Sequence, residues 1–272
     1  MARLVTTLRR LLRFNLPVRW VLLAAAIVLA LRAPFLGAGS GWWLTALASY
    51  YFAITVGFSV GMHRYFCHRA FETSRFWEGV MLGTAVVSLA GMPFTWTRAH
   101  LRHHKHSDQP DDPYRVKTAG WRSIFLPYDP GLTRSYVTRW LRDPMHRRAN
   151  AYYNAWVVAF VAALWAAGGV EAATFVWAIP VAVIHPLRQF YFHYSIHTWG
   201  YRNFETTDDS RNNWLIALLT GGEGWHNNHH HDPRSWSFRR RWWEIDPGAL
   251  FVAAIRRGQR APASRRRGVS AA

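Results

Sequence analysis

The chain has 272 residues, of which 50% are hydrophobic, 16% aromatic and 18% charged, and its formal net charge is +18. Such a high apolar content excludes an intrinsically disordered chain. A single cysteine, Cys67, excludes an intramolecular disulfide framework and a cysteine-rich metal site. Two classes remain, a nucleic-acid-binding protein and a membrane protein with basic faces, and the distribution of the apolar residues separates them.

Residues 1–19 form a basic segment with five arginines, which precedes two apolar segments. The first apolar segment, residues 20–36, is interrupted only by Arg32, and the second, residues 42–62, carries no charge. The connection between them is rich in glycine and has no basic residue. Because a helix needs ~20 mostly apolar residues to span a bilayer, we predict a first transmembrane hairpin over residues 20–62. A cleaved signal peptide is the alternative for the first segment, but no clear cleavage site follows it.

Residues 63–150 are more polar and contain a third apolar stretch, residues 77–96. This stretch is long enough to span a bilayer, but it includes three glycines and Pro93. If it spanned, the histidines before and after it would lie on opposite sides of the membrane. We therefore predict a helix that lies in the membrane interface or enters the bilayer and returns.

Residues 151–194 are again apolar, and a short connection without Lys or Arg divides them, which predicts a second transmembrane hairpin. Residues 195–250 form a second polar region, and residues 251–272 form a basic tail. The positive-inside rule then places both termini and both polar regions in the cytoplasm. The expected fold is all-α and has one domain, residues 1–272, with four transmembrane helices in two hairpins and a cytosolic helical cap.

Nine of the 14 histidines fall into three motifs and one single position. The first motif is H-x4-H at the end of the second apolar segment, and the second and third are both H-x-x-H-H. The nine are His63, His68, His100, His103, His104, His197, His226, His229 and His230, of which His197 is the single one. Ordinary surface or helix-end roles are expected for His106, His146, His185 and His231.

The spacing of the nine histidines predicts a site for two metal ions. Residues three and four apart share a face of a helix, so the rings of each H-x-x-H-H motif converge, while adjacent histidines can serve different metals. His63 and His68 are five apart, diverge by ~140° on an α-helix, and suit two metals better than one. Nine ligands exceed the needs of one ion and are about right for two.

The type of ligand narrows the choice of metal. Imidazole suits zinc, copper, iron and nickel, but structural zinc is satisfied by four ligands that usually include cysteine. Two histidine-rich sites that face each other at a membrane surface are better suited to two irons that activate O₂. The motifs thus favour a di-iron centre in the cytosolic cap.

These motifs resemble those of the integral-membrane fatty acid desaturases, specifically the Δ9 acyl-CoA desaturase branch. The matching stretches are residues 61–74, 96–108, 208–213, 222–230 and 242–247. The resemblance implies a four-helix membrane anchor, a cytosolic cap with two irons, and the nine histidines as ligands. His193 stands where the family has an asparagine that acts through water; it is a possible tenth ligand or a hydrogen-bonded helix-end residue. Tyr114 departs from the family, which usually has Asp-Pro-His where this chain has Asp-Pro-Tyr.

The activity that the resemblance implies is the O₂-dependent introduction of a cis double bond at Δ9 of a saturated acyl chain, carried as a long-chain acyl-CoA or an acyl-lipid. The substrate residues implied by it are Trp96, Arg98, Gln189 and Phe190. Carboxylates beside the motifs are candidates for orienting the imidazoles through their second N–H: Asp108, Asp208, Asp209 and Glu223. Arginines beside the motifs, Arg64 among them, are candidates for binding phosphates of the carrier.

The chain has no dinucleotide fingerprint, no cysteine-rich ferredoxin pattern and no haem-binding segment like that of cytochrome b5. Electrons must then come from a separate donor, a ferredoxin or a cytochrome-b5-like protein with its reductase, and a basic cytoplasmic face would attract an acidic carrier.

Two rival functions remain. One is a membrane di-iron hydroxylase or acyl-lipid oxygenase with the same motifs. The other is a non-enzymatic membrane metal-binding protein, which predicts ligands inside the spanning segments. Nucleic-acid binding is excluded, because the basic residues flank apolar helices instead of forming a soluble basic domain.

Overall fold

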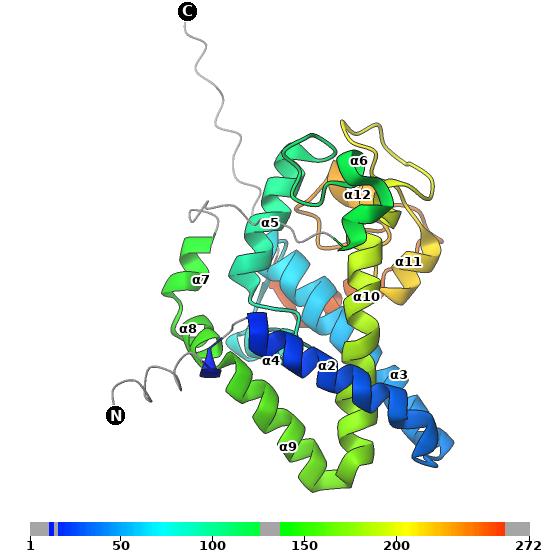
Figure 1. Cartoon of the computed structure of the whole chain (residues 1–272). Coiled ribbons are helices and arrows are strands. Elements are labelled where there is room, and N and C mark those ends of the chain that lie inside the picture. Colours follow the sequence, from blue (N-terminus) through cyan, green and yellow to red (C-terminus); the bar gives the residue numbers. More distant parts are fainter. Residues whose placement is uncertain (1–10, 14–15, 126–136, 259–272) are drawn as a thin grey trace, which may run out of the picture.

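The computed structural model describes residues 11–13, 16–125 and 137–258, and these are mostly helical (Figure 1). Most of the basic N-terminal segment and most of the basic tail lie outside this part. The elements in chain order are α2 Leu16–Arg32, η1 Ala33–Phe35, α3 Ser40–Phe52, η2 Ala53–Cys67, β1 Glu72–Thr73, α4 Arg75–Val87, α5 Pro93–His106, α6 Val116–Ala119, η3 Gly120–Phe125, α7 Thr138–Arg142, α8 Pro144–Ala151, α9 Tyr153–Ala172, η5 Ala173–Ala178, α10 Ile179–His193, η6 Ser195–His197, α11 Trp214–Leu219, α12 His226–His231, α13 Pro247–Ile255 and β2 Arg256–Gly258.

Three helices in the described residues are long and apolar enough to cross a membrane. They are Pro17–Phe35, Ser40–Cys67 and Tyr153–His197. The third has 45 residues and contains two non-helical residues, Gly168 and Gly169. Gly169 has a φ of 65°, which costs glycine little. The chain bends here, so that α9 and α10 are the two arms of a V (Figure 1). The predicted count of four spans requires each arm to cross by itself, and it stays a prediction.

Many large apolar side chains on these helices are exposed, as expected for surfaces that face lipid. Trp20 and Leu31 on α2, Leu44 on α3, and Trp156 and Trp165 on α9 are examples. The other faces of the helices pack together, with α10 against α2 and α3. The membrane-type helices occupy one end of the molecule, and the short helices α6, α11 and α12 lie at the other (Figure 1).

The second half of the long helix Ser40–Cys67 is a π-helix, η2, which is buried along its whole length. Glycines allow α4 to approach it closely. A Cβ atom at Gly57 would lie 2.9 Å from Thr84 Cγ2, and one at Gly61 would lie 3.0 Å from Met81 Cβ. π-helices are rare and frequently lie at functional sites, and the end of η2 carries His63 of the first histidine motif.

The apolar stretch at residues 77–96 is not one helix. Ser74 caps the start of α4 by accepting a hydrogen bond from the backbone N–H of Trp77. A turn follows α4, with Gly91 at a φ of 93°, and Pro93 then begins α5. Neither helix is a candidate span, so the histidines on the two sides of this stretch are free to lie on the same side of a membrane.

The segments after α10 are held together by buried polar contacts. Arg64, at the end of η2, forms a fully buried bidentate ion pair with Asp246, which also caps α13. The expected all-α fold needs one small correction, because β1 and β2 form a two-stranded antiparallel sheet. This sheet ties the region after η2 to the end of α13.

Candidate metal centre

The nine histidines of the motifs, which come from distant parts of the chain, converge at one end of the molecule in two groups. The five-histidine group contains His63, His68, His100, His104 and His229. The four-histidine group contains His103, His197, His226 and His230. Within each group, one ring nitrogen of every histidine lies within 4.8 Å of the others. This is an arrangement in which several imidazoles can bind one ion.

Each H-x-x-H-H motif lies on a helix and contributes to both groups. On α5, His103 belongs to the four-histidine group and His104 to the five-histidine group; on α12, His229 and His230 divide in the opposite order. Neighbouring residues on a helix point ~100° apart, so two adjacent rings reach two adjacent positions. α5 and α12 therefore hold the two groups next to each other.

His63 and His68 depart from the expected geometry. We expected them to diverge toward two metals, but both lie in the five-histidine group, with ring centroids 4.9 Å apart. The expectation assumed an α-helix, whereas η2 is a π-helix, in which the hydrogen bond joins residues five apart. The backbone N–H of His68 donates to the carbonyl of His63 over 3.0 Å. This spacing brings the two side chains to the same face.

The Nε2 atoms of the five-histidine group face one another. His229 Nε2 lies 2.9 Å from both His63 Nε2 and His104 Nε2, and His104 Nε2 lies 3.0 Å from His100 Nε2. The ring of Trp96 stacks on His100, with centroids 4.4 Å apart and planes inclined by 13°. The predicted substrate residue Trp96 thus forms a buried wall of this group.

Three carboxylates hold the four-histidine group from outside. Asp112 lies 2.9 Å from His103 Nδ1. In the same way, Asp108 lies 3.0 Å from His197 Nδ1, and Asp208 lies 2.5 Å from His230 Nδ1. An imidazole that donates its Nδ1–H to a carboxylate presents an unprotonated Nε2 to a metal. The Nε2 atoms of His103 and His230 are buried and have no hydrogen-bond partner among the described residues.

One carboxylate serves the five-histidine group. Glu223 lies 2.5 Å from His63 Nδ1 and accepts a hydrogen bond from Ser59. Its burial raises the pKa of this carboxyl to about 8, although Arg64 and the Ser59 hydroxyl act in the opposite direction. The five-histidine group is therefore oriented by one fully buried acid, where the other group has three.

Burial also lowers the pKa of rings in both groups. It lowers the pKa of His68 to about 3 and that of His230 to about 4, and neighbouring positive charge adds to the effect at His68. The pKa of His229 is lowered for the same reason, and so are those of His100, His104 and His226. At neutral pH these imidazoles offer lone pairs, and imidazole is a suitable ligand for iron. The residues fit two iron ions, one at each group.

Residues 40–254 match the family model that is described as "Fatty acid desaturase". The chain belongs to the fatty acid desaturase family. Curated relatives include the sn-2 palmitoyl-lipid 9-desaturase of Nostoc sp. (strain 36), which is 30% identical over 80% of this chain and 79% of its own length. They also include an acyl-CoA 5-desaturase of Anemone leveillei, 31% identical over 83% of this chain and 72% of the relative. A third is the hex-5-enoyl-[acyl-carrier protein] acetylenase of Moorena producens, 30% identical over 72% of this chain and 68% of the relative.

Within the desaturase family the chain falls in the branch that holds the Δ9 enzymes. The three relatives named above differ in the position of the bond and in the acyl carrier, which is a lipid, coenzyme A or a carrier protein according to their names. The family thus establishes a desaturase, but not the position of the double bond or the acyl carrier.

The other predicted substrate residues have the following surroundings. Gln189, on α10, donates to the carbonyl of Ile124, and Phe190 packs against Trp199. Arg98 is half-buried on α5. Arg64 was considered as a phosphate ligand, but this prediction is wrong, because its guanidinium is fully buried against Asp246.

Among the candidate orienting acids, Asp209 does not contact a histidine, whereas Asp112, for which no role was predicted, does. Asp209 was expected beside a histidine, but its carboxylate pairs with Lys117 at the surface, and only its backbone N–H reaches the site, where it donates to Asp108. Asp112 was not singled out, yet it is buried against His103. Its carboxylate also accepts the backbone N–H groups of Asp108 and Tyr114, a turn for which Asp followed by Pro is a recognisable signal.

Asn228, inside the third motif, was also missed. Its side chain accepts from the amides of Asn203 and Asn212 and donates to Glu244 and to the carbonyl of Phe238. All four of its hydrogen-bonding positions are used, which holds α12 in place. Asn228 therefore supports the helix that carries His226, His229 and His230.

The histidines outside the two groups have other surroundings. His146 is buried 3.4 Å from Glu78, His185 lies 3.4 Å from an Arg19 nitrogen, and His231 stacks on Phe204. The side chain of His193 lies outside the described part of the structure, so its role stays a prediction.

Proposed function

We propose that the chain is an O₂-dependent membrane desaturase that introduces a cis double bond at Δ9 of a saturated long-chain acyl-CoA, with one iron held by each histidine group. The observation that carries this proposal is the pair of adjacent groups of histidines, in which nine mostly buried rings converge on two positions. When bound, two irons supply the oxidising power that protein side chains lack for removing hydrogen from an unactivated methylene. The family membership supports the reaction class.

The protein's own part is to hold and orient. Each of His63, His103, His197 and His230 is fixed in rotation by a carboxylate at Nδ1. Such outer partners raise the basicity of the ligand and set its tautomer. Most of the nine rings are buried, which limits the access of bulk water to the two metal positions.

For the substrate we propose that the acyl chain passes Trp96, whose ring stacks on His100, so that one methylene reaches the five-histidine group. Gln189 and Phe190 would line the more distant part of this path, and Arg98 would contact the phosphates of the carrier. Acyl-CoA is the proposed carrier, and an acyl-lipid is the principal alternative that the relatives offer.

For electron delivery we propose docking of an acidic ferredoxin or cytochrome-b5-like donor on the cytoplasmic face, with four spans and both termini on that side. A pocket of about 550 Å³ supports the docking of a donor, because His68 and His104 line it together with Arg69 and Arg234. It is a place where a donor could approach the five-histidine group with complementary charge.

The test is expression in a host of known fatty-acid profile, followed by gas chromatography of the methyl esters. We expect a new cis-monoene with the wild-type chain and none with His229→Ala. His231→Ala is the matched control, because this neighbour lies on the same helix but outside both groups. A hydroxylated product without an alkene would support the hydroxylase alternative, and an unchanged profile with iron bound would require another substrate.

A further inference from the structure

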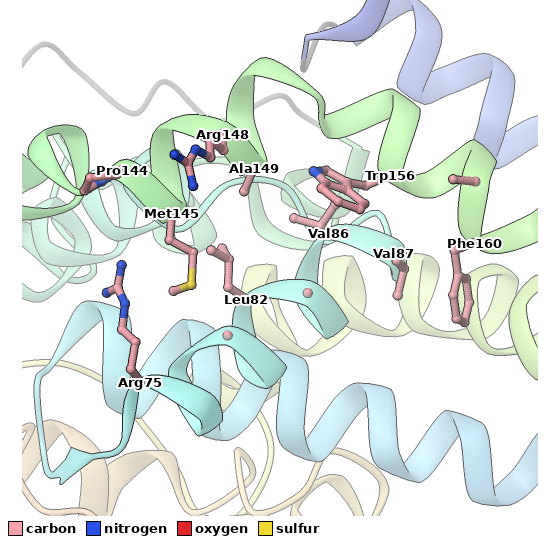
Figure 2. A pocket seen from close by; sticks show the side chains of 13 residues that line it. Arg75, Leu82, Val86, Val87, Pro144, Met145, Arg148, Ala149, Trp156 and Phe160 are labelled. Carbon is pink, nitrogen blue, oxygen red and sulfur yellow. The ribbon is translucent and has the colours of Figure 1, made fainter.

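A groove of about 810 Å³ lies between α4, α8 and α9, and none of its lining residues belongs to a histidine group. Its walls are mainly apolar and include Leu82, Val86, Met145, Trp156 and Phe160 (Figure 2). The volume is within the range of roughly 300–1,000 Å³ that is usual for small-molecule sites. The reaction proposed above makes no use of this groove.

Two glycines on α4, one turn apart, keep the groove open. A Cβ atom at Gly83 would have no atom within 4 Å, and one at Gly79 would lie 3.7 Å from Met145 Sδ. Glycine is less favourable than alanine inside a helix, because it loses more conformational freedom on folding. A side chain at Gly83 would not clash with any neighbouring atom. The effect of this glycine is therefore to leave the groove unfilled.

The groove has a charged end and an aromatic end. Figure 2 shows Arg75 and Arg148 near one end, and Phe160 at the other. Arg75 is already paired, 2.6 Å from Asp143 and 2.9 Å from Glu78. Arg148 is exposed and makes no ion pair with any residue that the structure describes. One cation therefore remains for an anion at this end.

The charged end of the groove lies beside a membrane-type helix, and this position indicates which kind of molecule carries the anion. Arg148 precedes the start of the third candidate span, Tyr153–His197, by five residues, while Trp156 and Phe160 lie in the first turns of that span. A basic residue just outside a span and a tryptophan just inside it are typical of the level of lipid headgroups. The apolar part of the groove then runs from this level into the hydrocarbon.

We propose that this groove binds an anionic phospholipid, with its phosphate at Arg148 and one acyl chain along Leu82, Val86 and Phe160. Arginine is well suited to phosphate because its guanidinium donates two parallel hydrogen bonds. Burial of the chain against the apolar walls supplies affinity that does not depend on charge. The site depends on the embedding in the membrane and is separate from the desaturation site.

The experiment uses the full chain in detergent and measures its Tm with added dioleoyl phosphatidylglycerol, dioleoyl phosphatidylcholine, palmitoyl-CoA or inorganic phosphate. For the wild type at a hundredfold excess of phosphatidylglycerol over Kd, we expect a rise on the order of 5 °C, and a smaller rise with phosphatidylcholine. Native mass spectrometry counts the bound lipids.

Two pairs of variants separate the parts of the site. Gly83→Leu fills the groove and should abolish most of the rise with both lipids. Gly41→Leu is its control, because a Cβ at Gly41 on α3 also meets no atom within 4 Å. Arg148→Gln should abolish the preference for phosphatidylglycerol, whereas Arg147→Gln, at an exposed neighbour outside the groove, should keep it.

Equal responses of Gly83→Leu, Arg148→Gln and the wild type would overturn the proposal. A rise with palmitoyl-CoA that is lost in Gly83→Leu and competes with phosphatidylglycerol would also overturn it, since the groove would then serve the acyl substrate. A rise with inorganic phosphate alone that matches the rise with lipid would show that a free anion is the ligand. Arg148→Gln removes an exposed side chain, so it keeps the test valid even if Gly83→Leu fails to fold.

Discussion

The two histidine groups lie side by side but are built differently. The five-histidine group has more nitrogen donors and one orienting acid, Glu223, whose pKa burial raises to about 8. The four-histidine group has fewer donors and three acids, Asp108, Asp112 and Asp208. Burial by itself would raise the pKa of these three, but hydrogen bonds from the histidines and from backbone N–H groups outweigh it and lower each pKa.

The two groups thus fit a metal site in two different ways. One position relies on the number of rings, and the other relies on ionised carboxylates that fix the rings and add negative charge around them. We therefore expect the four-histidine position to be more sensitive to the loss of a carboxylate and to release its iron last when a chelator is added.

The largest expected effect comes from removing one ring from either group. His229→Ala and His230→Ala change adjacent residues on α12 that belong to different groups. Each should lower the iron content from about two to about one per chain and reduce desaturation by more than about 100-fold, because nothing replaces the lost ligand. Metal analysis of the purified protein measures the first effect.

His231→Ala should keep both irons, because its ring stacks on Phe204 outside the groups. If His229→Ala and His230→Ala left the iron content unchanged, the assignment of the two groups to two metals would be wrong.

The next largest effect is expected at a neighbouring pair of aspartates. Asp208→Asn removes the charge that faces His230 Nδ1, and it should weaken metal binding or activity by roughly 10- to 100-fold. Asp209→Asn removes a charge that faces only the surface residue Lys117, and it should change either quantity by less than about twofold. Competition with a chelator measures the affinity, and equal losses in the two variants would contradict the geometry.

A smaller effect is expected for Glu223→Gln, which tests whether the five-histidine group depends less on its carboxylate than the four-histidine group does. The amide oxygen can still accept the Nδ1–H of His63, and four other rings of the group are independent of this contact. The expected loss of metal affinity is less than about tenfold, below that of Asp112→Asn in the four-histidine group. Chelator titrations of both variants test the order, and the reverse order would contradict the contrast drawn between the groups.

Among the substitutions of residues that contact the histidines, the smallest effect is expected at Tyr114, which packs on His103 with ring centroids 4.7 Å apart. Its hydroxyl is 3.4 Å from His100 Nδ1, near the limit of a hydrogen bond. Tyr114→Phe keeps the packing and should change the rate of desaturation by less than about threefold. A loss comparable to that of Asp208→Asn would mean that the hydroxyl has a direct role in the reaction.

Local patterns in the sequence predicted much of the site. The helical H-x-x-H-H spacing indicated that α5 and α12 each present rings to two adjacent positions, and the structure has this division. The same patterns failed for His63 and His68, because the π-helical hydrogen bonding of η2 changes which residues share a face. The glycines that allow α4 to pack against η2 were visible, but the packing itself was not.

The sequence alone was enough for the helical character, the apolar segments and the histidines that share a face of α5 or of α12, since these follow from composition and from spacing along one helix. Tertiary structure alone decided which carboxylate faces which ring, so that Asp112 lies at the site and Asp209 at the surface. It also decided that α4, α8 and α9 leave a groove beside Arg148. The physical reason is that such contacts join residues far apart in the chain, and their partners are chosen by how whole helices pack.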